Sequence, residues 1–307
     1  MRKLEKNRIF APELILTNKQ LVIMKKMRLL TMMFATMVAG GAWAQEKYNT
    51  WPWDFPQNIK LEVELGQTVL SPEGHYFAAI EKKEDLSKAT LIWYDKKVDK
   101  VGDGTVTINK FGQSREVPNA LIIPLKKQQK AKKGDILLTW WQGGSGLQRA
   151  IVIDDSTPTE PTAVFIDLYW PDDPDDPKVA ERAKGRKLEP NSFNVLKEGE
   201  WESGAQVAYR DNGEWKSGII MNVDGDKLLL AGWADKLVVV EKGACKLVPF
   251  KEKIKKGDKV WCEWLDYYKP DYTVEKIDQK LGHVWVKRGD SNRIECKGIH
   301  QITKTLD

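Results

Sequence analysis

The sequence predicts an all-β protein in which a small, strongly bent β-barrel is repeated in tandem. Three features predict this class. Four segments open in the same way, the same four segments close in the same way, and no amphipathic helix of convincing length separates them. Self-similarity between segments is the signature of a repeated structural unit, and short strands divided by turn residues are typical of small barrels.

Each segment opens with a glycine that leads into a short apolar strand. These openings lie at residues 66–69, 134–137, 204–207 and 257–260. A second strand is expected at residues 76–80, 148–152, 215–219 and 272–277. A third strand is expected at residues 90–94, 163–169, 228–231 and 283–286. The first segment has an extra hairpin-like stretch at residues 101–112.

The closings agree even better, because residues 117–123, 189–195, 241–247 and 296–302 align without a gap. Their third position holds Asn119, Asn191, Gly243 or Gly298. Asn and Gly tolerate positive φ, so this position predicts a tight bend between a fourth and a fifth strand. The alternating apolar residues that follow suit a strand with one buried face.

These patterns divide the chain into six parts. They are residues 1–44 (a spurious extension and a signal peptide), 45–62 (a linker), and 63–125, 134–197, 204–250 and 257–307 (barrels 1 to 4). A barrel of this size is close to the lower limit for a stable core, so neighbouring barrels are expected to pack together.

The connections between barrels are polar. The basic run at residues 126–133 is interpreted as a solvated connector rather than an anion site. Residues 177–186 are expected to form a short surface helix. Clustered carboxylates attract Ca²⁺, but prolines stiffen the run before this helix, and a solvated acidic loop is the favoured interpretation of Asp172, Asp173, Asp175 and Asp176.

Residues 24–44 have the features of a secretory signal peptide. A basic start that includes Lys25 and Arg28 precedes an apolar run at residues 29–41, and Ala42 and Ala44 frame the expected cleavage site. The run is too short to anchor the chain across a bilayer, although an uncleaved anchor remains the alternative. We expect translation to start at Met24 or Met27 and the mature protein, periplasmic or secreted, to begin after Ala44 with no membrane span.

Removal of the signal peptide also removes the positive net charge. The chain has 49 basic and 44 acidic residues, and residues 1–44 hold eight and two of them, which leaves 41 basic and 42 acidic side chains. A protein that neutralises many phosphates needs a persistent positive face. No nucleic acid partner is therefore expected.

The chain has few cysteines for a disulfide scaffold. Cys245, Cys262 and Cys296 are an odd number, so at least one stays unpaired within a monomer. Cys262 and Cys296 lie in one repeat, and whether they pair is left open, with a structural disulfide as the less favoured interpretation.

The third segment carries a resemblance to a known fold. A first strand ends at Tyr209, an Asp-Asn-Gly turn follows at residues 211–213, Trp215 opens the second strand, and Trp233 follows the third. This order resembles Tudor-like domains of the Src-homology-3-like class. The resemblance implies that aromatic side chains beside the first turn and the third strand form a cage for a cationic group through cation–π attraction. The candidate ligand-binding residues at such positions are Trp140, Trp141, Tyr169, Trp170, Tyr209, Trp215, Trp233, Trp261, Trp264, Tyr267 and Tyr268.

The paired tryptophans limit how many of these rings serve the core. Adjacent residues on a strand point to opposite faces, so Trp140 and Trp141 cannot both be buried in one core. One of them should meet another barrel, a ligand or water. For any single Trp, packing in the core or between barrels is the favoured interpretation.

The sequence offers no recognisable catalytic set. The three histidines are His75, His283 and His300, and no nucleophile motif accompanies them. His300 takes the place that Cys245 and Phe193 occupy in sister repeats, which favours packing over catalysis. No zinc-ligand spacing or phosphate loop is present in the sequence, so we expect no catalytic residues, no cofactor and no metal.

These observations lead to three functional hypotheses. The first is an exported, non-catalytic binding or scaffold protein that presents aromatic and charged loops to a protein partner. The alternative is a cell-wall or polysaccharide-binding protein, because barrels of the Src-homology-3-like class include wall binders. The third is a hydrolase with a dispersed carboxylate site.

Overall fold

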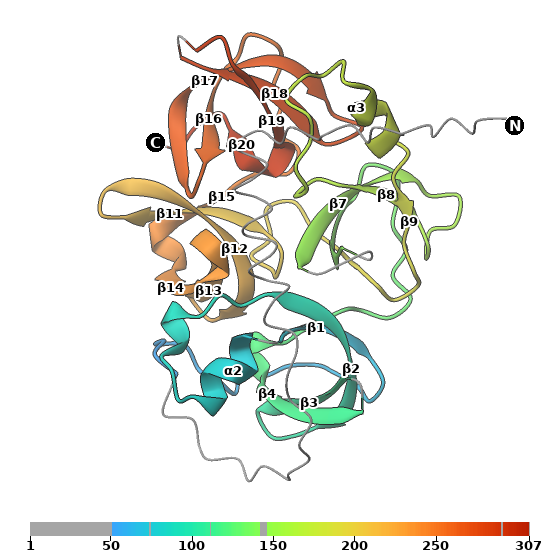
Figure 1. The fold of residues 1–307 in the computed structure, drawn as a ribbon, viewed down its shortest axis with the longest axis vertical. Helices are drawn as coiled ribbons and strands as arrows, with labels where there is room; N and C mark the ends of the chain where they lie inside the picture. Colours follow the sequence, from blue (N-terminus) through green and yellow to red (C-terminus); the bar gives the residue numbers. More distant parts are fainter. Residues whose placement is uncertain (1–50, 74, 111, 142–145, 290, 307) are drawn as a thin grey trace, which may run out of the picture. The chain divides into compact units, whose positions relative to one another are not determined.

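Antiparallel β-strands form most of the regular structure in the computed structural model, which describes residues 51–306 except 74, 111, 142–145 and 290. In this described part the strands form three sheets, two with five strands each and one with ten (Figure 1). The predicted all-β class is confirmed. The predicted signal peptide lies outside the described residues.

The first two sheets share one strand order. The first contains β1 (Thr68–Pro72), β2 (Trp93–Val101), β3 (Thr105–Lys110), β4 (Gln113–Pro118) and β5 (Ile123–Pro124), in the order β4-β3-β2-β1-β5. The second contains β6 (Ile136–Trp140), β7 (Leu147–Asp154), β8 (Thr162–Phe165), β9 (Arg186–Lys187) and β10 (Asn194–Val195), in the order β10-β6-β7-β8-β9. In each sheet the first strand pairs with both the second strand and the last.

The third sheet contains the same arrangement twice. One set is β11 (Gln206–Asp211), β12 (Glu214–Asp224), β13 (Lys227–Ala231), β14 (Leu237–Glu241) and β15 (Cys245–Leu247). The other is β16 (Lys259–Trp264), β17 (Tyr267–Asp278), β18 (His283–Arg288), β19 (Ile294–Gly298) and β20 (Ile302–Thr303). Lys216 of β12 pairs with Tyr267 of β17 and joins the two sets into one sheet.

The glycine that opens each set has the same conformation and the same hydrogen bond. These glycines have φ between +73° and +94°, a region that glycine enters at low cost. In every set the glycine N–H donates to a carbonyl of the second strand at 2.7–2.8 Å, and the pairs are Gly66 with Val98, Gly134 with Val152, Gly204 with Ile220 and Gly257 with Val274. A register shift follows directly in each second strand, and such bulges bend strands.

A 3₁₀ turn precedes the last strand in three of the sets. These turns are η2 (Asn119–Leu121), η4 (Lys242–Ala244) and η5 (Ile299–Gln301). The predicted bend therefore lies where expected, but the predicted positive φ is found only at Asn191 (φ 59°). Position 298 (φ −68°) requires glycine for a different reason. A Cβ at this position would lie 2.6 Å from the carbonyl oxygen of Ile166 and 2.3 Å from the His300 ring.

One predicted strand is wrong and another is out of order, because the third strand expected at residues 90–94 overlaps β2, the second strand of the first set. Residues 76–80, expected to form the second strand of the first set, belong to helix α2 (His75–Glu81). Its two buried residues, Tyr76 and Ala79, are three positions apart, which is a helical spacing. Helix α2 and η1 (Leu86–Lys88) are inserted between β1 and β2, so the hairpin-like stretch at residues 101–112 contains the turn from β2 into β3.

The short surface helix is found as expected. Helix α3 (Pro177–Arg182) begins after Asp176, whose carboxylate accepts the N–H of Lys178 at 2.8 Å. Proline suits the first position of a helix because it needs no N–H there. Neither helix in the described part of the chain has the length and apolar character that a membrane-crossing helix needs.

One large apolar cluster joins the first three strand sets, and the fourth set has a cluster of its own. Buried residues of the first three sets, such as Val69, Leu138 and Leu230, belong to a single cluster. Asn222 of β12 donates to the carbonyls of Ala120 and Ile122 at 2.8 and 3.0 Å. Residues 48–307 accordingly form one compact unit.

Candidate functional site

The paired tryptophans at the end of β6, Trp140 in the strand and Trp141 directly after it, alternate between core and surface. Trp140 is 8% exposed, whereas Trp141 is 41% exposed, as the alternation of a strand requires. Trp170 is buried and stacks on His283 of β18, with 3.9 Å between the ring centroids. The adjacent Tyr169 is 71% exposed. Of these four candidates, Trp141 and Tyr169 are therefore accessible.

The predicted cage of the third set already contains cations from the chain. The Arg210 guanidinium lies 4.0 Å from the centroid of the Trp215 ring, and the Lys246 ammonium lies 5.4 Å from it. Tyr209 is buried, and its hydroxyl lies so close to Gly232 that a side chain at that position would contact it. Cation–π attraction thus operates within the protein at this position, and only Trp233 is left exposed.

The candidates of the fourth set are mostly engaged as well. The Tyr267 ring has Lys216 and Lys269 at 5.3 and 4.9 Å, and the Trp264 ring has Arg288 at 5.0 Å. Tyr268 and Trp261 contact one apolar cluster that also contains Trp215 of the third set. Trp261, Tyr267 and Tyr268 therefore lie in the contact between the third and fourth sets, whereas Trp264 is covered by Arg288 of its own set.

Trp233 is presented by an unusual turn. It begins η3 (Trp233–Asp235) and is 52% exposed. The next two residues, Ala234 and Asp235, both have φ of 56°, a region that side chains with a Cβ adopt at a cost. The Asp235 carbonyl accepts the N–H of Leu91, and the Gly232 N–H donates to Lys236 at 2.9 Å, so contacts on both sides hold the turn.

A buried polar junction, which we define as Arg149, Asp167, Gln206 and His300, joins three strand sets. The Arg149 guanidinium donates to Asp167 at 2.6 Å and to the Gln206 side chain at 2.7 Å. His300 Nε2 lies 2.9 Å from the same carboxylate. Burial alone would raise the pKa of Asp167, but the charge of Arg149 and the hydrogen bond from His300 hold it well below its usual range. Burial lowers the pKa of His300, so its ring is neutral at neutral pH.

Further polar groups extend this junction. Gln206 donates to the Ser217 hydroxyl at 2.6 Å and lies 3.4 Å from the hydroxyl of Tyr268. Burial raises the pKa of Tyr268 above its usual range and also raises the pKa of Glu263, whose carboxylate accepts from Gln301 at 3.4 Å. These groups bond mainly to one another and are largely buried. The arrangement can therefore fix the positions of the three strand sets relative to one another.

Sequence reasoning singled out only His300 from the junction. Arg149 and Asp167 carried a weak signal, since a charged residue in the apolar strand 148–152 needs a buried partner. Gln206 carried none, because its partners lie far away in the sequence.

The cysteines are free and protonated. Cys245, Cys262 and Cys296 form no disulfide. Burial raises the pKa of the Cys245 thiol to about 11 and that of Cys296 to about 12. Since the thiolate is the nucleophile, these thiols are poorly reactive at neutral pH.

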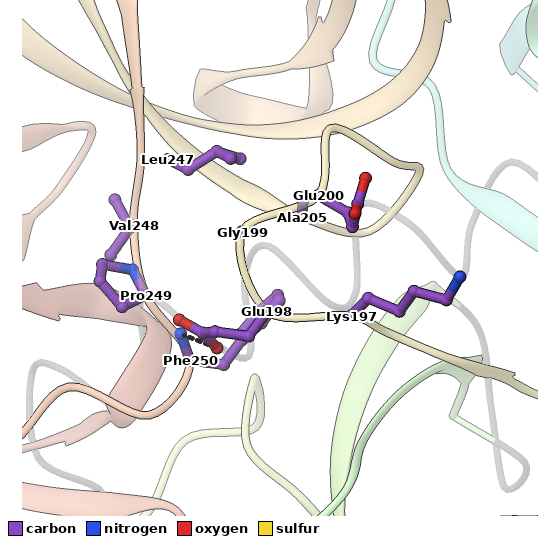
Figure 2. Close-up of a pocket in the computed structure, with 9 residues that line it drawn as sticks. All are labelled: Lys197, Glu198, Gly199, Glu200, Ala205, Leu247, Val248, Pro249 and Phe250. Carbon is purple, nitrogen blue, oxygen red and sulfur yellow. Dashed lines mark hydrogen bonds between the residues drawn. The ribbon is translucent and has the colours of Figure 1, made fainter.

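A small pocket of about 170 Å³ lies between the connector before β11 and the chain after β15 (Figure 2). Figure 2 shows Glu198 accepting the N–H of Phe250, a hydrogen bond of 3.2 Å. Leu247, Val248 and Pro249 form an apolar side, and Lys197 and Glu200 stand on the other. The pocket has room for a group the size of a side chain, and no candidate from the sequence lines it.

The described residues contain no group of three or more His, Cys, Asp or Glu side chains placed to hold a metal ion. No protein-family model and no curated protein sequence matches this chain, so its function is argued from the residues described above.

Proposed function

We propose that this chain is an exported, non-catalytic binding protein built of four small barrels of the Src-homology-3-like class, and that it presents Trp233 to a protein partner. In this proposal the signal peptide at residues 24–44 directs export to the periplasm or the exterior and is removed after Ala44. The barrels are residues 63–125, 134–197, 204–250 and 257–307.

The strand pairings support the barrel part of the proposal. Every set is a meander of four strands whose first strand also pairs with a fifth. The bulge in each second strand bends the sheet at the same place, and bending lets a small sheet close on itself.

The exposed ring of Trp233 carries the binding part. Most other candidate rings are buried or covered by cations of the chain, whereas this ring makes no ring contact with any described residue. A Trp ring buries a large area at low entropic cost, which is why Trp is enriched at binding hot spots. Ala234 and Asp235 store backbone strain beside it, and such strain is concentrated at functional positions.

The test is affinity capture of the tagged protein from its native envelope, followed by mass spectrometry and sugar analysis. We expect one enriched protein that Trp233→Ala no longer retains. Trp264→Ala is the matched control, because Trp264 is 37% exposed but is covered by Arg288, and it should retain the partner. Equal retention by the two variants contradicts the role of Trp233. Retained glycan without protein replaces the proposal with the polysaccharide-binding alternative.

A further inference from the structure

The fourth strand of every set lies at the edge of its meander. These strands are β4, β9, β14 and β19, and each pairs with a single neighbouring strand. An edge strand exposes unpaired N–H and C=O groups to which another strand can add, and natural proteins usually block such edges.

Three of these edges are blocked. In β4, Asn119 donates to the Gly104 carbonyl, so the preceding residue, Pro118, faces the open side, where it has no N–H to offer. Strand β9 has only two residues, both charged. In β19, the N–H of Cys296 donates to Asp172 and that of Gly298 to the Gln301 side chain.

Strand β14 has no proline, is longer than β9, and has no side chain bonded to an N–H on its open side among the described residues. Its sequence is Leu-Val-Val-Val-Glu, and its ladder with β13 contains no bulge. The Lys236 carbonyl and the Lys242 N–H both bond toward β13. Because strand residues alternate in direction, Leu237, Val239 and Glu241 direct their backbone groups to the open side.

Part of this open side is already used. The Trp53 indole donates to the Leu237 carbonyl at 3.0 Å, and the Cys245 thiol lies 3.3 Å from the Glu241 carbonyl. Among the described residues, no partner is found for the N–H and C=O of Val239 or for the N–H of Glu241. The side chain of Val239 is half-buried, so this position is reachable from solvent.

We propose that β14 binds an extended segment of a partner protein by strand addition, a recognised mode of peptide binding. This inference rests on the proposed binding function, because the turn that presents Trp233 leads directly into β14. The segment should place apolar side chains beside Val239 and a basic one opposite Glu241, whose carboxylate forms no salt bridge with the described residues.

A second copy of this chain is a poorer occupant. Trp53 covers the Leu237 end, so two β14 edges would have to pair through Val239 and Glu241. That register places the Glu241 carboxylates of the two copies on adjacent strands, and like charges in such positions repel.

The test uses the full chain and a labelled peptide, fluoresceinyl-Lys-Val-Thr-Val-Thr-Val-Lys-amide, with fluorescence anisotropy as the readout. We expect binding, and we expect Val239→Pro to weaken it by about tenfold or more, because proline removes the open N–H without touching the ladder to β13. Ser114→Pro is the matched control. It lies on the open side of β4, beside an edge that Pro118 already blocks, and should leave binding unchanged.

A second measurement does not depend on how the variants fold. The same peptide with every Val and Thr backbone amide N-methylated keeps its charge and side chains but has no N–H on either edge of the segment between its lysines, so it cannot donate to a ladder with β14, and it should not bind to the unmodified protein. No binding of the parent peptide, equal binding of the methylated peptide, or equal binding by Val239→Pro overturns the inference. Dimerisation that Val239→Pro abolishes also overturns it, in favour of a second copy. If capture of a partner depends on Trp233 but not on Val239, the proposed binding function holds and strand addition at β14 is wrong.

Discussion

Loss of the Asp167 charge should destabilise the protein more than any surface change. Asp167→Asn keeps the shape of the side chain and an oxygen that accepts from His300, but it leaves the charge of Arg149, which is 2% exposed, without a counter-ion. Leaving one partner of a buried ion pair uncompensated costs about 3–5 kcal/mol. For a chain of this length, this corresponds to a fall in Tm of about 6–20 °C. Urea unfolding followed by Trp fluorescence measures the loss.

The control variants separate charge from packing. Arg149→Met combined with Asp167→Asn removes both charges and should cost less than Asp167→Asn alone, because no uncompensated charge remains. Asp271→Ala breaks the exposed pair with Arg288 and should change the free energy of unfolding by less than about 1 kcal/mol. A cost below about 1 kcal/mol for Asp167→Asn, or a double variant less stable than the single one, refutes the reasoning about the buried junction.

Two further results are expected. Burial lowers the pKa of His283 to about 3, whereas an unfolded His has a pKa of about 6.5. The folded state holds His283 neutral, and the stability that depends on this is complete above pH 6.5. It is lost as the pH falls toward 3, by about 1.4 kcal/mol per pH unit. The lowered pKa of His300 acts in the same direction. Urea midpoints measured between pH 7.5 and pH 5 should show this slope, and His283→Phe, which can still stack on Trp170, should reduce it; an unchanged slope contradicts the assignment. Gly298→Ala should cost about 1–3 kcal/mol because its Cβ overlaps the Ile166 carbonyl and the His300 ring. Gly243→Ala, whose Cβ meets no atom within 4 Å, should leave the free energy of unfolding almost unchanged. Equal losses of stability in the two alanine variants would show that the overlap at residue 298 is relieved without strain.

The repeated pattern was readable from the sequence because it is local. A glycine with positive φ and a hydrogen bond to the second strand opens each set, and the aligned closings mark the bend before the last strand. The strand expected at residues 76–80 was wrong, because so short an apolar run does not distinguish a period of 2 from one of 3.6. The helix there depends on the core that Tyr76 and Ala79 enter.

The candidate site depended far more on tertiary structure. The sequence identified the aromatic residues, but it could not show that Arg210 and Lys246 cover Trp215 or that His283 stacks on Trp170. Nor could it show that Val239 faces an open edge while Pro118 blocks another.

By itself the sequence determined the all-β class, where the repeated sets open and close, and the residue types at their turns, since these follow from backbone preferences within a few residues. Only the tertiary structure decided which rings stay exposed and how Arg149, Asp167 and His300 meet. Contacts between residues far apart in the chain depend on how the strand sets pack, and local preferences do not encode that packing.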